Sequence, residues 1–129
     1  MIGTKILIAD DDDDLRCLLA MRCRGLGLEV VTASDGLSAL RLACDDPPDI
    51  VCMDVNMPGG NGLAACELLA EDPRFSQVPV IVLTGQSDRD IVRRCHGLGS
   101  YYVPKCADVW PRIAPILEKF LDDAENLCP

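Results

Sequence analysis

Three aspartates of this 129-residue chain follow two short apolar runs that lie far apart in the sequence. Asp10 and Asp11 come directly after the run Lys5–Ala9, and Asp54 comes directly after the run Asp49–Met53. Carboxylates that crowd together in a partly dry site repel one another strongly, and a divalent cation between them relieves that repulsion. Oxygen ligands without histidine or cysteine favour a hard ion such as Mg²⁺. These residues therefore predict a Mg²⁺ site, on condition that the fold brings them together.

Short apolar runs alternate along the chain with patterns of helical spacing. The near-continuous apolar character of Ile50–Met53 and Val80–Leu83 is typical of strands that are covered on both faces. The alternation predicts an α/β fold, in which a doubly wound, parallel, five-stranded sheet carries five helices on its two faces. The predicted strands are Lys5–Ala9, Glu29–Ala33, Asp49–Met53, Val78–Leu83 and Tyr101–Val103.

Apolar residues at helical spacing mark the segments between these strands. Four of the helices are marked by Leu15, Leu18 and Leu19; by Leu37 and Leu40; by Leu63 and Cys66; and by Ile113, Ile116 and Leu117. The remaining helix, the fourth along the chain, is expected to begin at the N-cap Ser87 and to end before Gly97. Pro111 and Pro115 fall early in the fifth helix, and Pro115 is expected to force a late start or a kink.

The carboxyl ends of parallel strands meet at one edge of the sheet, and doubly wound sheets bind their ligands at that edge. An acidic pair after a single strand is a weak signal, because aspartate also caps helices. A further carboxylate, a hydroxyl and a lysine at three other strand ends make the signal strong. The residues expected at this edge are Asp10, Asp11, Asp54, Thr84, Gly85 and Lys105.

The order and spacing of four segments resemble the receiver domain of two-component response regulators. The segments are Ile6–Asp11, Pro48–Gly62, Pro79–Gly85 and Tyr102–Lys105, and the resemblance covers essentially the whole chain, residues 1–129. It implies a flavodoxin-like sheet with the strand order 2-1-3-4-5. It also implies a signalling switch rather than an enzyme, because a receiver domain promotes only its own phosphorylation and dephosphorylation.

The resemblance implies a phospho-acceptor and a metal site at the sheet edge. Asp54 would take a phosphoryl group from a phosphohistidine of a sensor histidine kinase or a phosphotransfer protein. Mg²⁺, with Mn²⁺ as an alternative ion, would be held by Asp11, Asp54 and the backbone carbonyl of Asn56. Asp10 would lie close to the ion and reach it through water.

The resemblance also implies groups that handle the phosphoryl oxygens. Lys105 would place its ammonium on one oxygen, and Thr84 would donate its hydroxyl to another. Gly85 would leave room for the phosphoryl group to enter. Asn56 and Gln86 would control access of the hydrolysing water, and so the lifetime of the phosphorylated state.

A conformational switch follows from the same resemblance. Phosphorylation would draw Thr84 inward, and Tyr102 would rotate into the space that is vacated. The surface formed by the fourth helix, fifth strand and fifth helix would then change shape, and a partner or a second copy of the chain would bind it. Cys106 follows Lys105 where the family usually has a proline with a cis bond. A cis bond to a non-proline residue costs about 3–4 kcal/mol, so the bond is either trans with the lysine aimed differently, or cis and strained.

Three other hypotheses about function are compatible with some of these residues. A Mg²⁺-dependent phosphohydrolase with an aspartyl nucleophile, similar to the haloacid dehalogenases, would carry the nucleophile on the first strand, whereas Asp54 follows the third. A flavodoxin-like cofactor binder needs donors after the first strand, where the run Asp10–Asp14 would repel a flavin phosphate. A receiver-like interaction module that is never phosphorylated would not need the acids together with Thr84 and Lys105.

Acidic residues outnumber basic ones by 21 to 12, which gives a net charge of −9. Such a chain repels nucleic-acid phosphates and anionic lipids, so this domain is expected to bind neither nucleic acid nor membranes. Within the run Asp10–Asp14, the last three residues are expected to form a solvated first turn of a helix.

The chain contains eight cysteines but no C-x-x-C pair, so neither a zinc site nor a thioredoxin-like site has its usual spacing. Six of the cysteines lie inside apolar periodic segments, and we expect free thiols that behave as small hydrophobic residues. Free thiols, together with a start that lacks the pattern of a signal peptide, predict a cytoplasmic location.

Overall fold

The computed structural model describes residues 3–55, 57, 62–85, 93, 101–105 and 108–127, without the side chains of residues 63 and 123–127. Within these residues the chain forms five strands, four α-helices and one 3₁₀ turn. In chain order they are β1 Lys5–Ala9, α1 Asp13–Gly25, β2 Glu29–Ala33, α2 Gly36–Asp45, β3 Ile50–Asp54, α3 Gly62–Glu71, η1 Pro73–Phe75, β4 Val80–Thr84, β5 Tyr101–Pro104 and α5 Trp110–Leu127.

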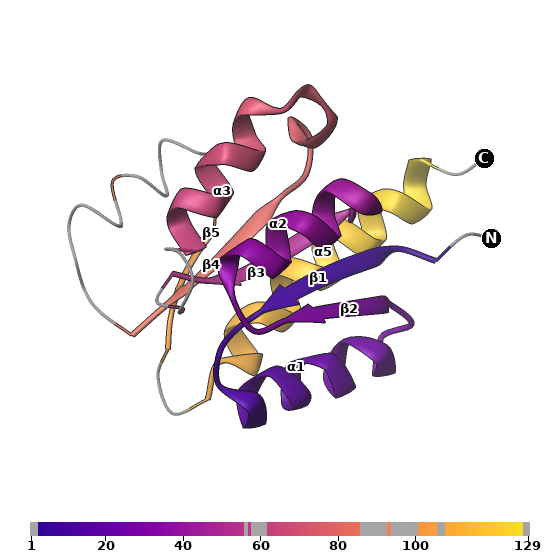
Figure 1. Ribbon diagram of the computed structural model, residues 1–129. Coiled ribbons are helices and arrows are strands. Elements are labelled where there is room, and N and C mark those ends of the chain that lie inside the picture. Colours follow the sequence, from indigo (N-terminus) through magenta and orange to yellow (C-terminus); the bar gives the residue numbers. More distant parts are fainter. Residues whose placement is uncertain are drawn as a thin grey trace.

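The five strands form one parallel sheet in the order β2-β1-β3-β4-β5, which confirms the predicted strand order (Figure 1). β1 and β3 are central neighbours, with Ile6 opposite Ile50 and Ala9 opposite Met53. Every residue of these two strands is buried, as expected of strands that are covered on both faces. β2 lies at one edge of the sheet and is largely exposed or half-buried.

The helices cover the sheet on both sides and enclose two separate cores (Figure 1). Successive side chains of a strand point to opposite faces, so Ile6 and Ile8 join one core while Leu7 and Ala9 join the other. The first core packs β1 against α1 and α5, and the second packs it against α2 and α3. The predicted doubly wound architecture is therefore confirmed for the part of the chain that the structure describes.

The helix expected between Ser87 and Gly97 falls on residues outside the described part of the chain, apart from Arg93. Of the late start or kink expected for the last helix, the late start is wrong, because α5 begins at Trp110, before both prolines. The carbonyl of Val109 accepts hydrogen bonds from the amides of Arg112 and Ile113, at 3.0 and 3.1 Å. This turn is complete before Pro115, whose missing N–H removes only one later bond of the helix.

The five cysteines whose state is described are free, as predicted. Cys23, Cys52 and Cys66 are buried, whereas Cys17 and Cys44 are exposed. Burial raises the pKa of the Cys23 thiol to about 11, so this thiol stays protonated at neutral pH and packs as an apolar group. None of the helices within the described residues is long and apolar enough to cross a membrane.

Candidate functional site

The carboxyl ends of four strands bring the predicted site residues to one edge of the sheet. Asp10 follows the last residue of β1, and Asp54 and Thr84 are themselves the last residues of β3 and β4. Lys105 follows β5, and its amide donates a 2.7 Å hydrogen bond to the carbonyl of Thr84. The prediction placed Asp54 and Thr84 one residue beyond their strands. The structure includes both in the sheet, since Asp54 pairs with Leu83.

Three carboxylates gather at this edge. Asp10, Asp11 and Asp54 each offer an oxygen, and the three oxygens lie within 4.8 Å of one another. Asp10 is fully buried and Asp54 is 2% exposed, whereas Asp11 faces solvent. The cluster therefore has two dry ligands and one accessible ligand, which is a suitable arrangement for an ion that keeps part of its shell for water or substrate oxygens.

Lys105 is the cation that meets the cluster. Its Nζ lies 3.1 Å from Oδ1 of Asp10, 2.9 Å from Oδ2 of Asp10 and 3.0 Å from Oδ2 of Asp54. Burial alone would lower the pKa of Lys105, but the hydrogen bonds to Asp10 and Asp54 outweigh that effect and raise the pKa. The ammonium consequently stays charged and holds the two buried carboxylates together.

One ammonium does not satisfy all of the buried carboxylate oxygens. Oδ1 of Asp10 accepts hydrogen bonds from Lys105 and, at 2.9 Å, from the amide of Asp12. Oδ2 of Asp10 is buried and accepts no well-aligned hydrogen bond from the described residues, although Lys105 lies close to it. A buried oxygen without a hydrogen bond is costly, and three carboxylates facing one lysine leave excess negative charge. The residues present therefore fit a hard divalent cation such as Mg²⁺.

The turn between β1 and α1 carries the acidic pair and is itself held by hydrogen bonds. Asp12 is the N-cap of α1, and its side chain accepts from the amides of Asp14 and Leu15 at 3.0 and 3.2 Å. Asp13 and Asp14 form the first turn of the helix, where acidic residues are favourable, as predicted. The run of five aspartates thus divides into residues of the carboxylate cluster and residues that start the helix.

Arg16 reaches back from α1 to the same turn. Its Nη1 donates a 2.8 Å hydrogen bond to the backbone carbonyl of Asp10, and its Nη2 pairs with the carboxylate of Asp13. Arg16 is not among the site residues that the sequence predicted. No spacing rule in the sequence predicts that a guanidinium will bond the main chain six residues earlier.

Gly62 is a second residue whose importance the sequence pattern did not reveal. It opens α3, and its amide donates a 3.2 Å hydrogen bond to the carbonyl of Val55. A Cβ at this position would lie 1.9 Å from the backbone oxygen of Asp54. Only glycine therefore allows α3 to begin directly against the main chain of Asp54. A glycine at the start of a predicted helix, where good helix formers are usual, was the available signal.

Three other predicted residues, Thr84, Gly85 and Tyr102, lie in β4, in β5 or directly after β4. Thr84 is fully buried, and Tyr102 is half-buried in β5, where it packs on Val55 and Val82. A Cβ at Gly85 would meet no atom of the described residues within 4 Å. Asn56, Gln86 and Cys106 lie outside the described residues, as does the peptide bond between Lys105 and Cys106.

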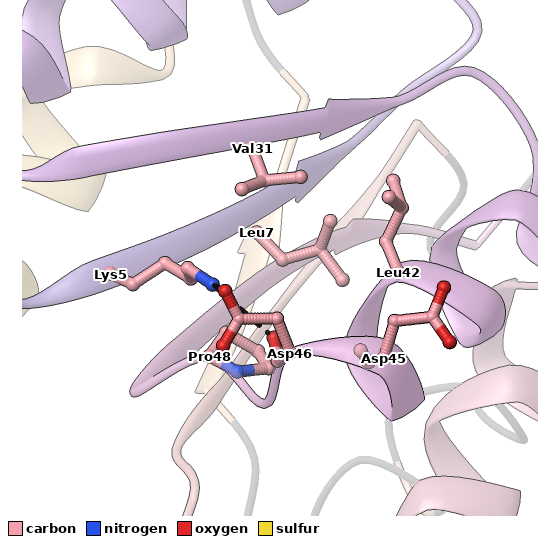
Figure 2. A pocket seen from close by; sticks show the side chains of 8 residues that line it. Lys5, Leu7, Val31, Leu42, Asp45, Asp46 and Pro48 are labelled. Atoms are coloured by element: carbon pink, nitrogen blue, oxygen red, sulfur yellow. Dashed lines mark hydrogen bonds and ion pairs between the residues drawn. The ribbon is translucent and has the colours of Figure 1, made fainter.

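A separate hollow lies at the opposite end of β1, where α2 meets the sheet (Figure 2). It has a volume of about 160 Å³ and mainly apolar walls. Its mouth carries an ion pair between Lys5 and Asp46 (Figure 2). The lining residues are Lys5, Leu7, Val31, Leu42, Ala43, Asp45, Asp46 and Pro48. None of them belongs to the carboxylate cluster, so the hollow is distinct from the acidic site.

A family model for the response regulator receiver domain matches residues 6–109. The chain belongs to this family. Receiver domains are the signalling switches of two-component systems, so the class of function that the resemblance implied is confirmed. The matched region contains every residue of the acidic edge, from Asp10 to Lys105.

Two solved structures and one curated relative show how far the similarity of this receiver domain extends. The N-terminal domain of an uncharacterized protein from Wolinella succinogenes gives a TM-score of 0.85 at 28% identity, covering 96% of this chain and 98% of that chain. A CheY-like receiver domain protein from Methanospirillum hungatei JF-1 gives 0.84 at 21% identity, covering 97% and 98%, a likeness of fold alone. Response regulator PleD of Caulobacter vibrioides is 38% identical over 91 residues, 68% of this chain and 20% of PleD. This receiver domain spans less than half of the length of the curated relatives that it matches.

Proposed function

We propose that this receiver domain accepts a phosphoryl group on Asp54 in a Mg²⁺-dependent reaction, from a phosphohistidine of a sensor histidine kinase or a phosphotransfer protein. The observation that carries the proposal is the arrangement of charges around Asp54. Its carboxylate lies within 4.8 Å of oxygens of Asp10 and Asp11, and its Oδ2 lies 3.0 Å from Nζ of Lys105.

Residues of this chain would perform the transfer chiefly by neutralising charge and by alignment. A carboxylate oxygen of Asp54 attacks the phosphorus, and the phosphorus–nitrogen bond to the donor histidine breaks as the new bond forms. Both the nucleophile and the phosphoryl group are anionic, so positioning and charge neutralisation supply most of the catalysis. Mg²⁺, when held by the carboxylates of Asp11 and Asp54 and the carbonyl of Asn56, with Asp10 reaching it through water, would supply further positive charge to the phosphoryl oxygens.

Lys105 and Thr84 would stabilise the product. The ammonium of Lys105, which contacts Asp54 before the reaction, would move onto a phosphoryl oxygen, and the hydroxyl of Thr84 would donate to another. The absence of any described atom within 4 Å of a Cβ at Gly85 supports its proposed role in admitting the phosphoryl group. Asn56 and Gln86 would regulate the water that later hydrolyses the aspartyl phosphate, so the domain would promote only its own phosphorylation and dephosphorylation.

The proposed output of the switch is a change in the surface around β5 and α5. Thr84 ends β4, which pairs with β5, and Tyr102 of β5 packs over Val82 of β4 and over Val55, which directly follows β3. An inward movement of Thr84 would change the packing of Tyr102 and reshape the surface shared with the fourth helix. A partner protein or a second copy of the chain would bind that surface. With its net charge of −9, the domain would contact neither nucleic acid nor membranes. Its free thiols support a proposed location in the cytoplasm.

Phosphorylation by a small phosphodonor tests the proposal without knowledge of the kinase. The wild-type protein, incubated with acetyl phosphate and Mg²⁺, should gain the mass of one phosphoryl group in intact-protein mass spectrometry. Asp54→Asn should gain none, Asp122→Asn on the exposed side of α5 should behave as the wild type, and a chelator should abolish labelling. Labelling of Asp54→Asn at the wild-type rate would refute the proposal. Steady turnover of a small phosphoester would instead support the hypothesis that the protein is a phosphohydrolase.

A further inference from the structure

We infer that Arg16 is a positioning residue for the divalent-cation site, because its guanidinium holds the peptide group that joins Asp10 to Asp11. The inference rests on the proposed Mg²⁺ site and adds a residue that contacts neither the ion nor the phosphoryl group. Two contacts define it, the 2.8 Å hydrogen bond from Nη1 to the carbonyl of Asp10 and the ion pair of Nη2 with Asp13.

The carbonyl that Arg16 binds belongs to the peptide between the two acidic residues. Its orientation is set by the ψ angle of Asp10 and the φ angle of Asp11, so a bond to it restricts the directions of both side chains. On its other side Asp10 is held by the sheet, since its amide donates a 3.1 Å hydrogen bond to the carbonyl of Ala33. Asp11 is exposed, so packing does not fix its carboxylate. The backbone bond from Arg16 is therefore well placed to aim the accessible ligand of the cluster.

The guanidinium is itself fixed in place. Asp13 lies one helical turn before Arg16, and the hydrogen bond from their ion pair is the main cause that raises the pKa of Arg16. The side chain of Arg16 is only 18% exposed. A planar guanidinium can bond a carbonyl and a carboxylate at once through two nitrogens, which a single ammonium group cannot do with the same geometry.

The charge of Arg16 and its hydrogen bond to Asp10 predict opposite effects on metal affinity when Arg16 is replaced. A positive charge near the cluster repels a cation, so removal of that charge alone would strengthen metal binding. Loss of the bond to the carbonyl of Asp10 would release the peptide and weaken metal binding. Arg16→Lys keeps the charge but loses the planar guanidinium that bonds the carbonyl and the carboxylate at once. Arg16→Gln loses both the charge and the guanidinium. If Arg16 positions the ligands, both variants bind the ion more weakly. Arg16→Gln does so even though the loss of a positive charge makes the cation site more negative.

The test is a titration of the free protein with Mn²⁺, in which electron paramagnetic resonance reports the unbound ion and added Mg²⁺ competes for the site. We expect the dissociation constant to rise about tenfold in Arg16→Lys and in Arg16→Gln, the lower end of the effect of residues that orient metal ligands. Arg22→Gln is the matched control, because Arg22 is an exposed arginine in the last turn of the same helix. Its dissociation constant should equal that of the wild type.

A second comparison leaves Arg16 in place. Asp13→Asn and Asp14→Asn each remove one carboxylate from the first turn of α1, but only Asp13 pairs with Arg16. Each substitution removes one negative charge and should weaken the attraction of a cation to a similar degree. A lower Mn²⁺ affinity in Asp13→Asn than in Asp14→Asn would therefore show the effect of a guanidinium that is no longer held by Asp13. This pair keeps the inference testable if the Arg16 variants do not fold. Unfolding followed by circular dichroism without metal identifies such variants.

The outcomes separate the inference from the proposed function. Wild-type affinity in Arg16→Lys, tighter binding in Arg16→Gln, or equal affinities in Asp13→Asn and Asp14→Asn would overturn the role of Arg16. A variant that is merely less stable, but folded at the temperature of the titration, would bind with wild-type affinity and so also count against it. A wild-type protein that binds no Mn²⁺ would overturn the metal site itself, and the inference with it.

Discussion

Nζ of Lys105 lies 3.0 Å from Oδ2 of Asp54, although the two residues are 51 positions apart in the chain. Lys105 also contacts Asp10, so one ammonium spans the carboxyl ends of β5, β3 and β1. The contact crosses the sheet over β4, the strand that ends at Thr84. The acidic edge is therefore held together by a side chain from the far strand of the sheet, and its stability and its chemistry are linked through that lysine.

Replacement of Lys105 by methionine should destabilise the protein in the absence of metal. Two buried carboxylates would lose their counter-charge, and we expect the free energy of unfolding at pH 7 to fall by roughly 2–3 kcal/mol, less than for a fully buried pair because Lys105 is partly exposed. Mg²⁺ should recover much of the loss by binding the carboxylates that the lysine no longer neutralises. Urea unfolding with and without Mg²⁺ measures both effects. Lys119→Met, at an exposed position of α5, should change neither value, and an equal response of the two variants would contradict the prediction.

The same lysine should produce an alkaline loss of stability. Its pKa is raised in the folded protein above the ordinary value of 10.5. A group with a raised pKa contributes stability that is complete below its ordinary pKa and disappears as the pH rises through the folded value. The difference in unfolding free energy between the wild type and Lys105→Met should therefore be constant near neutral pH and shrink above about pH 10.5. A difference that stays constant into that range would show that the charge of Lys105 is not responsible.

Gly62→Ala should be strongly destabilising, whereas Gly25→Ala should not. A Cβ at Gly62 would collide with the backbone oxygen of Asp54 at 1.9 Å, and we expect the free energy of unfolding to fall by roughly 2–3 kcal/mol as α3 shifts away. A Cβ at Gly25, the last residue of α1, meets no atom of the described part of the chain within 4 Å, and alanine there should stabilise the protein by about 0.5 kcal/mol. Urea unfolding of the two variants checks the contrast. Similar unfolding midpoints would mean that the close approach at Asp54 is easily relieved.

Side-chain size at position 85 should control phosphorylation without controlling stability. A Cβ at Gly85 meets none of the described atoms within 4 Å, so Gly85→Ala and Gly85→Val should both unfold within about 0.5 kcal/mol of the wild type. Alanine adds only a methyl group and should keep a near wild-type rate of labelling by acetyl phosphate. Valine projects further into the proposed path of the phosphoryl group and should slow labelling about tenfold, because small displacements at a transfer site are costly. Equal rates for the alanine and valine variants would remove Gly85 from the proposed mechanism.

The sequence was sufficient to predict the sheet and the residues at its edge, because both depend on local patterns. Apolar runs that alternate with helical spacing determine the class of fold, and the first residues after such runs lie at the carboxyl edge whatever the details of packing. The same reasoning gave β1 and β2 their correct bounds but placed the start of β3 one residue early. The end of a strand depends on its neighbour, and the pairing of Asp54 with Leu83 extends β3.

The contacts that the sequence did not predict depend on three-dimensional proximity. The bond from Arg16 to the carbonyl of Asp10 requires the exact course of the β1–α1 turn, and the contact of Gly62 with Asp54 requires the angle at which α3 leaves the sheet. Pro115 illustrates the converse case. Propensity alone predicted a late start or a kink, but α5 begins before both prolines, and the buried side chains of Ile113 and Leu117 anchor the helix on either side of Pro115.

The central pairing of β1 with β3 has a consequence for the order of events during folding. The carboxylates of Asp10 and Asp54 come from these two strands, which are neighbours in the sheet but are separated in the chain by β2 and its helices. A site divided in this way has no counterpart in an unfolded chain or in a fragment that contains only one of the strands. A cation bound there would resist the separation of β1 from β3, and would prolong the lifetime of the folded domain without guiding its first steps of assembly.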